Sequence, residues 1–151
     1  MKPTVVLLFV VGSALLGSAM LAQAKPNFSG TWIQVEPANR AEGGGSEQVV
    51  THDAVTLTTE HASEGGGHRQ VYKLDGESRF SVSSADVVAK AMWDGQKLVI
   101  TSTATYPENR RRDSKQVWSL GADGTLTIES SAKNPDGTTT DRKSVHRKKP
   151  A

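Results

Sequence analysis

The chain has 151 residues, no cysteine and a nearly balanced charge, with 18 Lys and Arg residues against 16 Asp and Glu residues. The balance excludes a strongly basic nucleic-acid binder as the default class. The lack of cysteine excludes disulfide bonds, thiolate zinc sites, thiol nucleophiles and a lipidated N-terminus.

The N-terminus has the order of a secretory signal peptide. Lys2 gives a positive start, residues 5–16 are an almost unbroken apolar run, and Ala22-Gln23-Ala24 places small residues where a signal peptidase reads. A transmembrane anchor is the alternative, but glycine and serine residues interrupt a run near the lower limit of ~17 residues for spanning. We expect cleavage between Ala24 and Lys25. The signal peptide is then 1–24, and 25–151 is a single domain in the periplasm or outside the cell.

The remaining chain predicts a series of short strands separated by turns. Glycine marks most of the turns, and Asp-Gly pairs at 75–76 and 94–95 are typical of tight hairpins. The second strand has a bend at His52-Asp53. The expected strands are 28–36, 49–60, 68–74, 79–84, 87–93, 97–106, 114–120, 125–131 and 138–147.

Apolar and polar residues alternate within these strands. Leu98, Ile100 and Ala104 share one face of their strand, while Thr101 and Thr103 share the other. Such a period of two indicates a sheet with one face against a core. A helical turn at 85–92 is an alternative to a strand there. Short sequential connections predict an all-β, up-and-down antiparallel meander of about 8–9 strands, closed into a barrel; a two-sheet sandwich is the alternative.

Three short motifs carry a resemblance. They are Asn27-Phe28-Ser29-Gly30-Thr31-Trp32, Trp93-Asp94-Gly95, and Trp118-Ser119-Leu120 followed by Asp123-Gly124. The first resembles the G-x-W signature of lipocalin-like (calycin) barrels, and the set is similar to small secreted bacterial proteins of unknown function. The resemblance implies that Trp32 closes the barrel floor beneath a basic residue of the last strand. Arg142 and Arg147 are the candidates for that residue.

The first functional hypothesis is a carrier with a pocket inside the barrel. Its ligand would be an apolar or amphipathic small molecule, because barrels of this size hold one ligand at most. A cavity of about 300 Å³ or more would favour this hypothesis over a filled interior. The predicted lining consists of Tyr72, Phe80, Trp93, Tyr106 and Trp118, and the glycine triplets at 43–45 and 65–67 are expected at the open rim.

The second hypothesis is a ligand-free module of the cell envelope that acts through its basic surface. Arg110, Arg111 and Arg112 are expected at a hairpin tip, where they could meet an anionic envelope component. A second basic cluster lies in the C-terminal segment 142–149. Neither cluster contains the aromatic residues that nucleic-acid binders use for stacking, so nucleic acid is not an expected partner.

No catalytic motif, metal site or cofactor site is predicted. His52, His61, His68 and His146 could bind a metal with Asp53 or Glu64, but their spacings match no known motif. No pair of carboxylates has a spacing that predicts general acid–base catalysis, and no nucleophile elbow is present. The glycine triplets do not join a strand to a helix, as phosphate-binding loops require.

Overall fold

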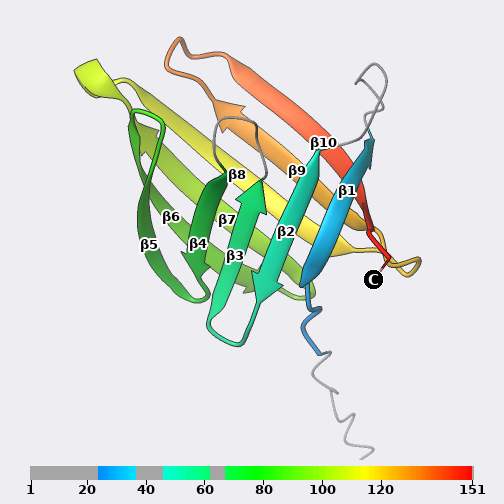
Figure 1. Cartoon of the computed structure of the whole chain (residues 1–151). Helices are drawn as coiled ribbons and strands as arrows, with labels where there is room; N and C mark the ends of the chain where they lie inside the picture. Colours follow the sequence, from blue (N-terminus) through cyan, green and yellow to red (C-terminus); the bar gives the residue numbers. More distant parts are fainter. Residues whose placement is uncertain (1–23, 37–45, 62–66, 151) are drawn as a thin grey trace, which may run out of the picture.

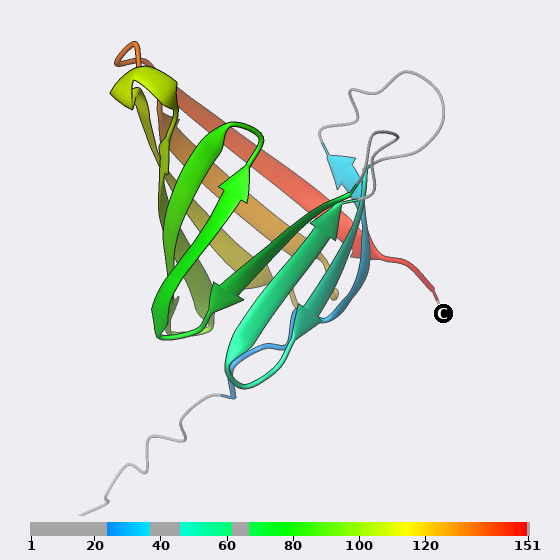
Figure 2. The same ribbon diagram turned by 60° about the vertical axis from the view of Figure 1, so that its left-hand side comes forward.

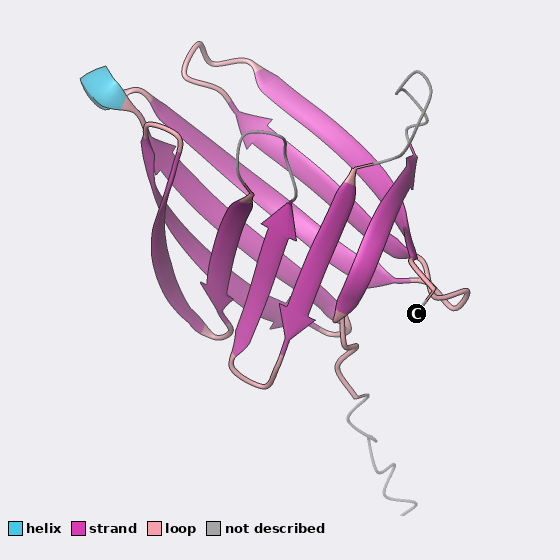
Figure 3. Ribbon diagram, viewed as in Figure 1, coloured by secondary structure: helices cyan, strands magenta, loops and turns pink. Residues whose placement is uncertain are grey.

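The computed structural model describes residues 24–36, 46–61 and 67–150. These residues form ten strands and a single turn of 3-10 helix (Figures 1 and 3). Of the expected signal peptide only Ala24 is described, and the glycine triplet at 43–45 lies outside the described residues. The elements are β1 (Gly30–Glu36), β2 (Glu47–His52), β3 (Thr56–His61), β4 (His68–Lys73), β5 (Gly76–Val82), β6 (Ala85–Asp94), β7 (Lys97–Thr105), η1 (Pro107–Asn109), β8 (Arg111–Leu120), β9 (Leu126–Lys133) and β10 (Thr139–Lys148).

The ten strands form one antiparallel sheet that curls into a nearly closed barrel (Figure 1). Each strand pairs with its neighbour in sequence from β1 to β4 and from β5 to β10, and β1 also pairs with β10. The prediction of an all-β up-and-down barrel is confirmed, and the sandwich alternative is wrong. No helix in the described part of the chain is long and apolar enough to cross a membrane.

The tenth strand arises at the bend expected near His52-Asp53. The Asp53 carboxylate accepts hydrogen bonds from the backbone N–H groups of Val55 and Thr56, both at 2.8 Å, and from the Thr56 hydroxyl at 2.9 Å. These bonds satisfy the turn locally, as Asp commonly does in turns. The predicted single strand 49–60 is therefore two strands, β2 and β3.

The segment for which a helical turn was the alternative is β6. Ala85, Val87, Ala89 and Ala91 are buried, and the residues between them are less buried or exposed. This period of two is that of a strand with one face against the core.

The barrel has one seam, between β4 and β5. No ladder joins these two strands, although a tight turn at Leu74-Asp75 connects them, and they diverge from that turn (Figure 2). The Tyr72 and Phe80 rings meet edge to face across the seam, with centroids 5.5 Å apart. The Ser78 hydroxyl accepts a hydrogen bond from the Lys73 N–H at 2.7 Å. Side chains hold the seam where backbone pairing is missing.

The interior changes in character along the barrel axis. The end where β1 begins is filled by large apolar side chains, which include Phe28, Trp32, Leu98, Trp118 and Leu126. Towards the other end, the inward positions of β7 and β8 are Ser102, Ser114 and Gln116 among others. The barrel therefore has a closed apolar end and a more polar half, and the candidate site lies in the polar half.

Candidate functional site

An aromatic cluster closes the apolar end of the barrel. The Phe28 ring stacks on the rings of Trp93 and His52, with centroids 5.9 and 5.7 Å apart. It also meets the Trp118 ring edge to face, with centroids 5.8 Å apart. Trp32 is 2% exposed, and its Nε1–H donates to the Phe28 carbonyl at 2.8 Å. Two residues predicted to line a ligand pocket, Trp93 and Trp118, thus lie in this cluster.

The basic side chain over the Trp32 ring is Lys148. Its Nζ is 5.8 Å from the ring centroid, and the two residues are directly paired between β1 and β10. Paired residues point to the same face of a sheet. The expectation of Arg142 or Arg147 is therefore wrong: Arg147 is paired with Ile33, one position out of phase, and Arg142 lies opposite Ser130.

His52 ties the segment before β1 to the end of β2. The imidazole Nδ1 accepts a hydrogen bond from the backbone N–H of Phe28 at 3.2 Å. The backbone N–H of His52 donates to the Ser29 hydroxyl at 2.9 Å. Burial lowers the pKa of His52, and the weaker influence of Asp53 opposes that shift. The neutral imidazole is therefore a structural group of the closed end.

A cavity of about 230 Å³ lies inside the other half of the barrel, beside the seam. Tyr72, Phe80 and Tyr106, three of the five predicted lining residues, surround it. Its volume is below the ~300 Å³ that usually marks a ligand pocket, so an occupant would be small or would protrude. The lining residues are Gln70, Tyr72, Phe80, Val82, Ser83, Ala85, Val87, Ser102, Ala104, Tyr106, Arg112, Ser114 and Gln116.

The cavity wall combines aromatic rings with hydrogen-bonding groups. The Tyr72 hydroxyl donates to Gln70 Oε1 at 2.6 Å, and Trp118 Nε1 donates to Gln116 Oε1 at 3.0 Å. Burial raises the pKa of Tyr72 to about 12, so its hydroxyl stays protonated at neutral pH. The Ser102 and Ser114 hydroxyls share one hydrogen bond of 2.8 Å. The wall can therefore bind both an apolar body and a polar end.

The arginine triplet expected at a hairpin tip does not form one surface. Arg110 lies over the Tyr106 ring, with 5.9 Å between its Cζ and the centroid. Arg111 is exposed and contacts Asp113, at 3.2 Å between Nη2 and Oδ1. Arg112 lines the inner cavity. The alternation of β8 separates the last two residues onto opposite faces of the barrel wall.

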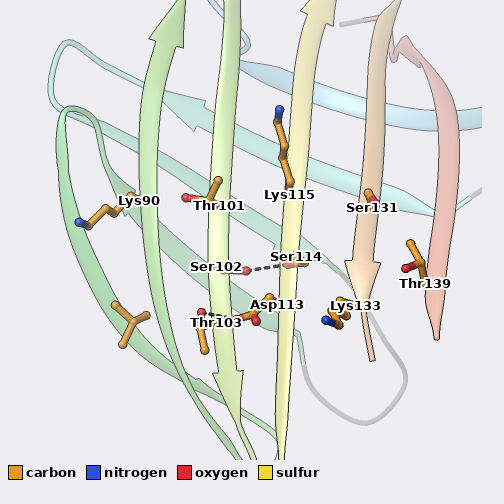
Figure 4. A pocket seen from close by; sticks show the side chains of 11 residues that line it. Lys90, Thr101, Ser102, Thr103, Asp113, Ser114, Lys115, Ser131, Lys133 and Thr139 are labelled. Carbon is orange, nitrogen blue, oxygen red and sulfur yellow. Dashed lines mark hydrogen bonds between the residues drawn. The ribbon is translucent and has the colours of Figure 1, made fainter. Parts of the chain in front are cut away.

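A second hollow, with a volume of about 530 Å³, lies on the outer face of β6 to β10. Figure 4 shows the side chains that line it. Lys90, Lys115 and Lys133 border it, together with hydroxyl side chains. Within the described residues, none of these lysines is at ion-pair distance from a carboxylate. The one acidic side chain that borders the hollow, Asp113, accepts hydrogen bonds from Thr103 and Arg111. The hollow is basic and open to solvent.

The histidines do not assemble a metal centre in the part of the chain that the structure describes, where no three His, Asp or Glu residues form a ligand group. His61 and His68 are paired across β3 and β4. His146 is 4% exposed, and burial, with a smaller effect of His61, lowers its pKa. Glu64, a predicted ligand, lies outside the described residues.

The fold is shared with proteins of known structure, although no relative is found by sequence. The sequence matches no protein-family model and no curated protein. The structure is similar to a secretory abundant heat soluble (SAHS) protein from Ramazzottius varieornatus, with a TM-score of 0.59 and 12% identity, over 85% of this chain and 98% of that one. It is also similar to human cRBP IV, a cellular retinol-binding protein, with a TM-score of 0.56 and 14% identity, over 82% of this chain and 99% of that one. Neither neighbour is named as an enzyme, and the fold is that of lipocalin-like barrels.

Sequence reasoning missed the polar lining residues, among them Gln70, Gln116 and Arg112. A signal for them was present, because each shares the face of a predicted inward residue: Gln70 precedes Tyr72 by two positions, and Gln116 precedes Trp118 by two. Extending the same alternation from Gln116 reaches Arg112. The prediction used only aromatic residues and therefore overlooked the polar part of the wall.

Proposed function

We propose that the protein is an exported, non-catalytic carrier that binds a small apolar or amphipathic molecule in the inner cavity. The observation that carries the proposal is the wall of the inner cavity, where Tyr72, Phe80 and Tyr106 lie beside hydrogen-bonding side chains; the volume of about 230 Å³ is below the expected ~300 Å³ and restricts the ligand to a small or protruding molecule. Aromatic walls with a few placed polar groups are typical of ligand sites. The likeness to a cellular retinol-binding protein supports a binding function for a barrel of this kind.

Native mass spectrometry of the mature chain, purified gently from its own compartment, tests this proposal. We expect a discrete added mass that is lost on denaturation. The variant Ala104→Phe fills the cavity and should abolish the added mass, whereas Thr105→Phe places the same ring at the adjacent exposed position and should retain it. A clean apo mass that persists after incubation with fatty acids, quinones and hydrophobic dyes would contradict the carrier function.

Export is part of the proposal and has its own test. The order of a positive start, an apolar run and Ala22-Gln23-Ala24 supports cleavage by a signal peptidase. N-terminal sequencing of the protein recovered from the periplasm or the medium should begin at Lys25. Recovery of the intact chain from the cytoplasm alone would contradict export.

A second candidate function is binding of an anionic envelope component on the outer hollow. The favouring observation is the set of three lysines, Lys90, Lys115 and Lys133, in one hollow of about 530 Å³. Changing all three to Ser should weaken binding to envelope fractions and reduce its salt dependence. Unchanged binding would remove this candidate without affecting the inner cavity.

A further inference from the structure

Among the described residues that line the inner cavity, Arg112 is the only one with a charged side chain. It is half-buried, and its Nε is buried with no hydrogen-bond partner among the described residues. A buried donor on a charged group costs free energy unless something accepts its hydrogen bond. The neighbouring carboxylate, Asp113, faces the outside of the barrel and binds Thr103 and Arg111 there. Among the described residues of the cavity wall, no carboxylate balances Arg112.

Other polar groups of the wall also offer hydrogen-bond donors to the cavity. Trp118 Nε1 can only donate, so Gln116 must turn its amide oxygen toward Trp118. This orientation leaves the Gln116 NH2 group as its free polar end. The Ser102 and Ser114 hydroxyls use one of their two hydrogens on each other and keep the second to donate. Arg112, Gln116 and the serine pair therefore present hydrogens to the cavity.

We propose that the cavity binds the anionic end of its ligand, a carboxylate, at Arg112, while the ligand's short apolar tail packs against the Tyr72 and Phe80 rings, which line the cavity and contact each other. A carboxylate supplies only acceptor oxygens and a negative charge, which matches both the donors and the uncompensated cation. The small volume favours a short monoanionic amphiphile over a long chain. This inference rests on the proposed carrier function and narrows its ligand class.

The test compares two ligands that share the same apolar tail and differ in their end group, an anionic carboxylate or a neutral amide, using the 15N-labelled mature chain. 4-Phenylbutyrate and its neutral amide, 4-phenylbutanamide, are titrated separately and followed by 1H–15N NMR, including the arginine Nε–H signals. We expect the carboxylate to bind at least about tenfold more tightly, which corresponds to about 1.4 kcal/mol. The shifted signals should be those of Tyr72, Phe80 and Arg112 Nε.

Two variants and a matched control assign the preference. Arg112→Gln keeps hydrogen-bonding capacity but removes the charge, and it should abolish the preference for the carboxylate. Arg112→Lys should keep part of that preference. Arg111→Gln makes the same change one residue away on the outer face and should leave both affinities unchanged. Thermal unfolding of each variant checks that the barrel remains folded.

The outcomes separate this inference from the carrier function. Equal affinity for the carboxylate and the amide, with shifts at the cavity, would overturn the anionic subsite and leave the carrier function standing. Equal affinity for acetate, inorganic phosphate and phenylbutyrate would also overturn it, because the tail would then contribute nothing. Binding of neither probe, combined with a clean apo mass in the native spectrum, would overturn both proposals.

Discussion

Gly30 and Lys148 explain at the level of single residues why the first strand opens with the order Gly-x-Trp. Gly30 has a φ of 145°, and a Cβ at this position would overlap the side chain of Lys148. That side chain passes Gly30 to place its Nζ over the Trp32 ring. A cation above an aromatic face is worth about 0.5–2 kcal/mol. Glycine is thus required for the close approach as well as for the backbone conformation.

We expect Gly30→Ala to lower the free energy of unfolding by about 1–2 kcal/mol, because alanine disfavours positive φ and displaces Lys148. Chemical denaturation measures the change. The same substitution in a Lys148→Ala background removes the overlap, so its remaining cost is the backbone part alone. Equal costs in the two backgrounds would mean that Lys148 does not require the glycine.

His52 makes the closed end sensitive to acid. Its Nδ1 accepts the Phe28 N–H, so protonation at Nδ1 removes that bond. Burial lowers the pKa of His52 below its ordinary value of 6.5. The unfolded chain then binds the proton at a higher pH than the folded barrel does, so stability falls as the pH drops below 6.5 toward the folded-state pKa. Burial lowers the pKa of His146 as well, and it adds to the loss.

We expect the melting temperature to decrease as the pH falls from about 7.5 to 5. The melting temperature of the His52→Asn variant should decrease less, because the amide oxygen of Asn accepts the same hydrogen bond without titrating. The carboxylates that accept hydrogen bonds in three turns titrate outside this window. Hydrogen bonds lower the pKa of Asp53, Asp123 and Asp136 below 3.8, so their contribution is lost only at a more acidic pH. An identical pH profile for the variant would exclude His52 as the cause.

At the level of elements, two strand connections have the same turn structure. In the β8–β9 connection, the Thr125 N–H and hydroxyl donate to Asp123 Oδ1 at 3.1 and 2.7 Å. In the β9–β10 connection, Thr138 makes the same two bonds to Asp136 at 2.9 and 2.6 Å. The glycine between the two partners has a φ of 78° in the first turn and 84° in the second. The sequence Asp-Gly-Thr therefore specifies both hairpins.

We expect Gly137→Ala to cost about 1 kcal/mol of stability, because no heavy atom lies within 4 Å of the added Cβ and the strain is that of the positive φ. Gly137→Asn should cost less, since Asn tolerates this region. Denaturant titrations of the two variants and the parent give the comparison. An asparagine variant as unstable as the alanine variant would contradict this explanation.

At the scale of the whole molecule, the seam between β4 and β5 leaves each of these strands with one partner. Backbone amides that face the seam have few hydrogen-bond acceptors. One example is the Lys73 N–H, which donates to the Ser78 hydroxyl. We expect seam-facing amides to exchange hydrogen about 100-fold faster or more than amides of β7 and β8, which are paired on both sides. Hydrogen-exchange NMR provides the measurement.

Ser78→Ala should accelerate exchange at Lys73 and leave the amides of β7 unchanged. Ser81→Ala is the matched control, because the Ser81 hydroxyl binds the exposed Asp86 away from the seam. Slow exchange throughout β4 and β5 would contradict an open seam held by side chains.

The period of two and the turn residues made the strands and the barrel class predictable. The Asp53 turn was visible only as a bend, because its bonds come from one side chain that sequence periodicity does not weigh. Periodicity assigns a residue to a face but not to a depth along the barrel axis. This is why Trp93 and Trp118 were grouped with Tyr72, although they lie in the closed-end cluster, and why Lys148 was missed as the partner of Trp32.

The pairing of β1 with β10 also has a kinetic consequence. It joins the two ends of the described barrel, whereas every other strand ladder joins neighbours in sequence. Local hairpins form quickly, but bringing distant segments together costs loop-closure entropy and slows folding. A circular permutant that begins at β5, ends at β4 and links β10 to β1 by a short turn would contain neighbour pairings alone. It would build the same barrel wall by the extension of hairpins and should therefore fold faster than the natural order.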